Sequence, residues 1–119
     1  MRDHHPNLDA CKVLDRLADI LYSRGSVYGP ASEHFERTSR ILSVVLPPGA
    51  AIGAREWAVV MICDKLARLG NPHCPPEDKW SRHLDTIEDV AGYAALLAGM
   101  IRREQQPDPF PASWTIQGA

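Results

Sequence analysis

Residues 82–103, RHLDTIEDVAGYAALLAGMIRR, carry the clearest helical pattern in the chain. Apolar side chains recur every three or four residues along one face, as in an amphipathic helix. These side chains are Ile87, Val90, Ala94, Leu97 and Ile101. Another side of the same helix has small residues that would let a neighbouring helix approach closely, namely Ala91, Ala95, Ala98 and Gly99. We therefore expect an all-α fold.

Three more helices are predicted upstream, each ended by glycine or proline. The first covers residues 8–24 and stops at Arg24-Gly25-Ser26, the second starts at Pro30 and stops at Pro47-Pro48-Gly49, and the third runs from Ala54 to Leu69. The third helix is apolar nearly all round between Trp57 and Cys63, so we expect it at the centre and both of these side chains in the core. Together the helices predict a four-helix bundle.

The length of 119 residues indicates a single domain. Residues 1–104 are expected to form the helical domain. Residues 105–119 form a tail that Pro107, Pro109 and Pro111 keep from being helical.

Charge and hydropathy exclude several classes of partner. The 13 basic residues are outnumbered by 15 acidic ones and form no dense cluster, so nucleic-acid binding is not expected. The longest apolar stretch, Trp57 to Cys63, is far shorter than the roughly 20 residues of a membrane span. The polar start, Met1 to His5, does not resemble a secretion signal. We therefore predict a cytoplasmic protein that does not bind membranes.

The apolar third helix and the small-residue face of the fourth would leave much apolar surface exposed in a monomer. We therefore expect a homodimer or a homotetramer.

Acidic residues on two of the predicted helices are the first candidates for a functional site. Glu33 and Glu36 are three residues apart on the second helix and share a face, so they could bind one cation. The alternative is a solvated surface, because Arg37 and Arg40 follow these glutamates at four residues and could form ion pairs with them.

The fourth helix has a similar acidic cluster of Asp85, Glu88 and Asp89. The alternative here is stabilisation of the helix N-terminus, where carboxylates are favoured by the helix dipole. Asp64 lies in the most apolar helix, where a lone charge is costly. It is either functional or the ion-pair partner of Arg68, one turn further on.

Three segments resemble, in order and spacing, phage-encoded MazG-like proteins of the all-α nucleoside triphosphate pyrophosphohydrolase superfamily. They are residues 28–37, residues 65–69 and residues 85–96. The resemblance covers about residues 24–100. It implies a cytoplasmic enzyme, in the host cytoplasm if phage-encoded, that converts a (deoxy)nucleoside triphosphate to its monophosphate and pyrophosphate. Some phage members act on guanine deoxynucleotides, which makes dGTP a candidate substrate.

The resemblance also implies roles for individual residues. Glu33 and Glu36 match the ExxE element and Asp89 matches the last acid of ExxD, so these carboxylates would hold Mg²⁺ or Mn²⁺. Thr86 occupies the position of the first ExxD acid, so a fourth ligand would come from Asp64, Asp85 or Glu88. The implied catalytic residues are Glu33, Glu36, Lys65 and Asp89.

Four residues are candidates for binding the substrate. Lys65 and Arg68 are the nearest cations for the phosphates, although both could instead be helix-end cations with buried stems. Tyr93 matches a tyrosine that some relatives place near the phosphates, and Trp80 could stack on the base. Two other functions remain open: a helical adaptor protein, and a module that sequesters a nucleotide without cleaving it.

Overall fold

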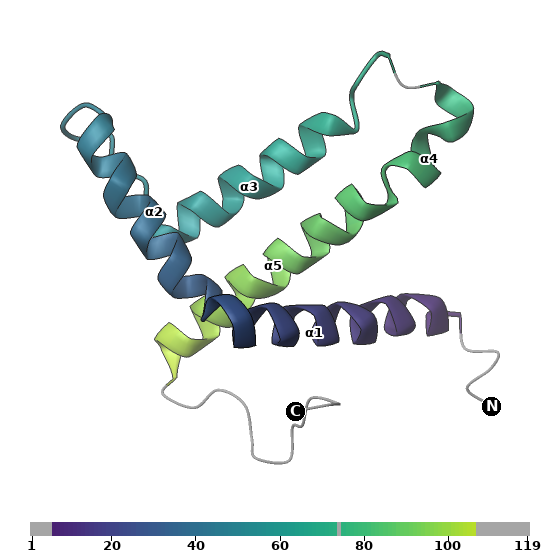
Figure 1. Ribbon diagram of the computed structural model, residues 1–119, viewed down its shortest axis with the longest axis horizontal. Coiled ribbons are helices and arrows are strands. Elements are labelled where there is room, and N and C mark those ends of the chain that lie inside the picture. The colour runs from purple at the N-terminus through teal and green to yellow at the C-terminus, as the bar shows by residue number, and fades with distance from the viewer. Residues whose placement is uncertain (1–5, 74, 107–119) are drawn as a thin grey trace.

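The computed structural model describes residues 6–73 and 75–106, and these residues are helical without any strand. The elements are α1 (Leu8–Tyr28), α2 (Ala31–Val45), α3 (Ala54–Arg68), the 3-10 turn η2 (Pro76–Asp78), α4 (Lys79–Arg82) and α5 (Leu84–Gln105) (Figure 1). The predicted all-α class is therefore confirmed. None of the described helices is long and apolar enough to cross a membrane. The predicted tail from residue 107 onward lies outside the described residues.

The first helix extends further than predicted, because Gly25 lies inside it. A glycine within a helix costs about 1 kcal/mol but does not end it. The turn instead occurs at Gly29, whose φ of 82° is favourable for glycine alone, and whose N–H donates to the Gly25 carbonyl at 2.9 Å. Pro30 then precedes α2 with an extended backbone. The predicted stop at Arg24-Gly25-Ser26 was therefore wrong.

The predicted fourth helix, residues 82–103, corresponds to α5, and a division between the short helix α4 and α5 occurs at His83. This residue has φ −103° and ψ 13°, and it follows α4 and precedes α5. The division makes Leu84 the first residue of α5, so Asp85 lies in the first turn of that helix. A carboxylate is stabilised there by the helix dipole.

The helices form an open arrangement around the pair α3 and α5. These two helices lie side by side and antiparallel, and they make the most extensive contact between any two elements (Figure 1). Helix α2 packs mainly on α3, and its Ser39 hydroxyl donates a hydrogen bond to the Ile52 carbonyl just before α3. Helix α1 touches α5 over a short stretch. A β-carbon at Gly92 would lie 3.9 Å from Cδ2 of Leu21, so the two helices approach closely at that point.

The described residues contain a small core. Leu17, Phe35 and Ala58 are the buried apolar residues. Trp57 is half-buried, whereas Val59, Val60 and Cys63 are exposed, so within a single chain α3 is not the fully enclosed central helix that was predicted. The prediction that Cys63 is a core residue was wrong for the isolated chain, because only one side of α3 is covered. Other large apolar side chains are also exposed, among them Val13, Leu14, Ile41, Val44, Val45 and Leu66.

Candidate functional site

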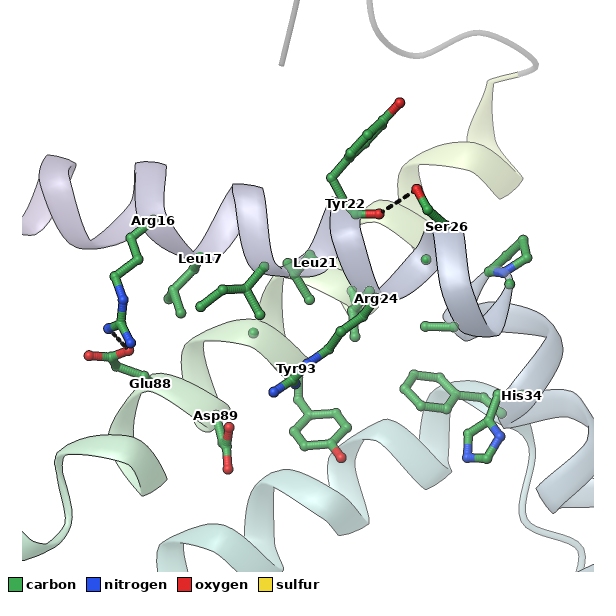
Figure 2. A pocket seen from close by; sticks show the side chains of 18 of the residues that line it. Arg16, Leu17, Leu21, Tyr22, Arg24, Ser26, His34, Glu88, Asp89 and Tyr93 are labelled. Carbon is green, nitrogen blue, oxygen red and sulfur yellow. Dashed lines mark hydrogen bonds and ion pairs between the residues drawn. The ribbon is translucent and has the colours of Figure 1, made fainter. Parts of the chain in front are cut away.

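A groove of about 1120 Å³ lies between α1, α2 and α5 (Figure 2). Lys65 of α3 also lines it. One part of its wall is charged, and another is apolar and aromatic. The charged and polar lining includes Arg16, Arg24, His34, Lys65, Asp85, Glu88, Asp89 and Tyr93. The apolar lining includes Leu17, Ile20, Leu21, Phe35 and Leu96. The groove thus gathers five of the predicted site residues: Lys65, Asp85, Glu88, Asp89 and Tyr93.

Lys65 and Asp89 form an ion pair across the α3–α5 contact. Lys65 is in the last turn of α3, and Asp89 is near the start of α5, so the antiparallel packing of the helices brings the two together. The distance from Lys65 Nζ to Asp89 Oδ2 is 3.2 Å. Their side chains are 15% and 38% exposed, so the pair is partly shielded from water. This shielding makes the interaction stronger than that of a fully solvated pair.

Arg16 and Glu88 form a second ion pair, which joins α1 to α5. Glu88 is the buried charged residue of the described chain, at 8% exposure, whereas the side chain of Arg16 is 59% exposed. A buried carboxylate needs a partner because it has lost its hydration. Sequence reasoning missed Arg16 because helical spacing identifies ion pairs within one helix, and this pair spans 72 positions.

Removal of Arg16 should leave the buried Glu88 carboxylate without its partner. We expect Arg16→Met to lower the free energy of unfolding by about 1–3 kcal/mol, measured by urea denaturation at neutral pH. Arg68→Met is the control, since Arg68 pairs with Asp64 on the surface and should cost at most about 1 kcal/mol. Equal effects of the two substitutions would contradict the proposed role of the α1–α5 pair.

An aromatic contact joins α2 to α5 at the same groove. The rings of Phe35 and Tyr93 are stacked, with centroids 6.2 Å apart and an interplanar angle of 27°. Phe35 is buried and Tyr93 is half-buried, so Phe35 fixes the ring of Tyr93 while part of Tyr93 still faces the groove. The ring of His34 lies beside that of Phe35, at 6.3 Å between centroids.

The other predicted site residues do not line this groove. Glu36 pairs with Arg40 at 3.7 Å, and Asp64 pairs with Arg68 at 3.2 Å, each between exposed side chains. Both ion pairs are the structural alternatives that the sequence offered. The Glu33 carboxylate lies near Gly29, where Oε2 would be 3.9 Å from an added β-carbon.

Trp80 is also away from the groove, in α4, and its side chain is exposed. Lys79 Nζ lies 5.3 Å from the centre of its ring, which is a cation–π contact between neighbours in the sequence.

Glu36 lines a second, smaller hollow of about 460 Å³ between α1, α2 and α5.

The part of the chain that the structure describes has no group of three or more acidic, histidine or cysteine side chains placed to hold a metal ion. Two carboxylates of α5 nevertheless line the groove together. Asp85 and Asp89 are four residues apart on α5, hence on one face, and both line the groove. Mg²⁺ is commonly held by one or two carboxylates together with water and substrate phosphates. This donor set therefore fits a divalent cation that binds together with a phosphate ligand.

These features define the protein as an all-α domain with a charged groove between its helices. Residues 12–101 match the family DUF6378, described as a domain of unknown function. The match covers more than half of the chain, so the chain belongs to this family. No curated protein and no solved structure matches the chain.

Proposed function

We propose that this protein is a nucleoside triphosphate pyrophosphohydrolase whose active site is the groove between α1, α2 and α5. The observation that carries the proposal is the placement of Lys65, Asp85, Asp89 and Tyr93 on one groove. A triphosphate carries several negative charges, so carboxylates bind it through divalent cations, and a lysine binds it directly. The resemblance of residues 28–37, 65–69 and 85–96 to MazG-like proteins supports the same reaction.

Each residue of the groove would have a separate role in the reaction. Asp85 and Asp89 would hold Mg²⁺ or Mn²⁺, which supplies polarisation of a phosphoryl oxygen and activation of a water molecule. Lys65 fixes the orientation of the Asp89 carboxylate through their ion pair and adds positive charge for the phosphates. Tyr93, held by Phe35, offers a partly apolar surface next to the charged part of the groove.

The proposed enzyme is an oligomer in which a second copy completes a MazG-like four-helix bundle. Large apolar side chains that are exposed in the single chain, among them Val44, Val45 and Leu66, support an association that would cover them. A second copy could also bring Glu33 and Glu36 to a groove that they do not line within one chain.

The reaction predicts a specific pair of products. Incubation with Mg²⁺ or Mn²⁺ and each common nucleoside triphosphate, dGTP included, should yield the monophosphate and pyrophosphate directly, as resolved by ion-exchange chromatography. Diphosphate and orthophosphate as the sole products would indicate a different phosphohydrolase. Stabilisation by metal and nucleotide without any product would indicate a sequestering module. The absence of both effects would indicate an adaptor protein.

A further inference from the structure

Helix α1 supplies a second arginine to the groove. Arg16, Ile20 and Arg24 follow one another at steps of four residues, so they lie on one face of α1, and all three line the groove. The Arg16–Glu88 ion pair and the approach of Leu21 to Gly92 hold this face against α5. Figure 2 shows the Arg24 side chain extending from α1 into the groove, on the side where Asp89 and Tyr93 project from α5.

The charges of the groove are only partly paired. Its wall has three basic side chains and three carboxylates, apart from His34. Glu88 is paired with Arg16, and Asp89 is paired with Lys65. Among the described residues this leaves Arg24 and Asp85 without an ion pair. Four arginines outside the groove have carboxylate partners, in Arg40–Glu36, Arg55–Glu104, Arg68–Asp64 and Arg82–Asp78, whereas Arg37 on the exposed side of α2 has no ion pair among the described residues.

One unpaired guanidinium and one unpaired carboxylate in the same groove complement a ligand that carries both signs of charge. A polyphosphate with a bound divalent cation is such a ligand, since its metal is attracted by the carboxylate and its free oxygens by the guanidinium. An arginine can bind two oxygens of one phosphate group at once, in a planar arrangement that a lysine does not reproduce.

We propose that Arg24 binds a phosphate group of the ligand's polyphosphate chain, so that α1 forms part of the binding site. The identification of this polyphosphate as part of a nucleotide rests on the proposed function. Anion binding by Arg24, in contrast, does not depend on hydrolysis. Arg24 is exposed and unpaired among the described residues, so its replacement should leave the melting temperature of the ligand-free protein unchanged.

The test is calorimetric titration of the full chain with inorganic tripolyphosphate in the presence of Mg²⁺. Arg24→Met should weaken binding about tenfold or more, because it removes a charge-assisted bidentate contact. Arg24→Lys should restore only part of the affinity. The matched control is Arg37→Met: Arg37 is an exposed arginine of α2 that lines neither the groove nor the smaller hollow. It should bind tripolyphosphate as the wild type does.

Equal affinities of wild type, Arg24→Met and Arg37→Met would overturn the proposal, as would the absence of tripolyphosphate binding by the wild type. Hydrolysis assays on the same variants distinguish the anion site at Arg24 from the proposed pyrophosphohydrolase activity. Binding that depends on Arg24, in a protein that cleaves no nucleotide, would support the anion site and count against the pyrophosphohydrolase. Cleavage with KM and affinity unaffected by Arg24→Met would support the enzyme and refute the role of Arg24.

Discussion

Asp89→Asn is expected to lower the turnover of nucleoside triphosphate by about 100-fold or more. The amide keeps the shape of the side chain but removes the negative charge that would hold a divalent cation. It also removes the ion-pair partner of Lys65, whose side chain is only 15% exposed, so a small loss of stability should accompany the loss of activity. We would measure kcat and KM, together with the melting temperature with and without Mn²⁺. The stabilisation by Mn²⁺ should shrink.

Asp64→Asn is the matched control for this substitution. Asp64 also has a basic partner at 3.2 Å, Arg68, but its side chain is 53% exposed and does not line the groove. It should retain near-wild-type turnover and response to Mn²⁺. If instead Asp64→Asn lost turnover as severely as Asp89→Asn, Asp64 would be the fourth ligand that the ExxD resemblance leaves open. A fully active Asp89→Asn variant would contradict the proposed catalytic role of the groove.

The predicted ExxE residues give a separate test of how the site is assembled. Glu33 and Glu36 do not line the groove within one chain, and Glu36 is paired with Arg40. Glu36→Gln should therefore reduce turnover only if a second subunit brings it to the site. If the reduction occurs, an inactive Glu36→Gln chain mixed with an inactive Asp89→Asn chain should recover part of the activity. This recovery would be measured as turnover after joint refolding.

The sequence was sufficient to predict the all-α class and most helix positions, because apolar spacing and proline act locally. It was not sufficient where the local residue types were compatible with more than one conformation of the chain. Gly25 lies within α1, and the chain turns instead at Gly29, where φ is positive. Likewise, the short helix α4 before His83 was not predicted, because four residues are too few to show a helical spacing of apolar side chains.

The side chains that line the groove could also be predicted only in part from the sequence. Lys65, Asp85, Glu88, Asp89 and Tyr93 could be found from the sequence, since they lie in short segments that resemble a known family. Arg16 and Arg24 could not be found in this way. Both arginines line the groove because α1 packs across α5. The spacing of residues within α1 does not reveal the direction in which the two helices cross. The Asp64–Arg68 and Glu36–Arg40 pairs, in contrast, were visible as alternatives because both partners lie on one helix.

The second large effect is expected at the exposed apolar end of α2. Ile41, Val44 and Val45 lie at helical spacing on this end and are 66%, 83% and 71% exposed. If a second copy covers them, Val45→Glu would place an unpaired carboxylate in an apolar interface, at a cost of several kcal/mol. We expect this variant to shift from dimer or tetramer toward monomer in light scattering. Its melting temperature should fall by about 10 °C or more.

Val27→Glu is the matched control for the interface. Val27 is also 71% exposed and also lies in the last turn of its helix, α1, so both substitutions oppose the helix dipole to the same degree. The control should keep the wild-type mass, and its melting temperature should fall by only a few degrees. An obligate oligomer also requires the wild-type melting temperature to rise with protein concentration, because association stabilises the folded subunits by mass action. A wild-type monomer at micromolar concentration would contradict the interface and the completion of the site by a second copy.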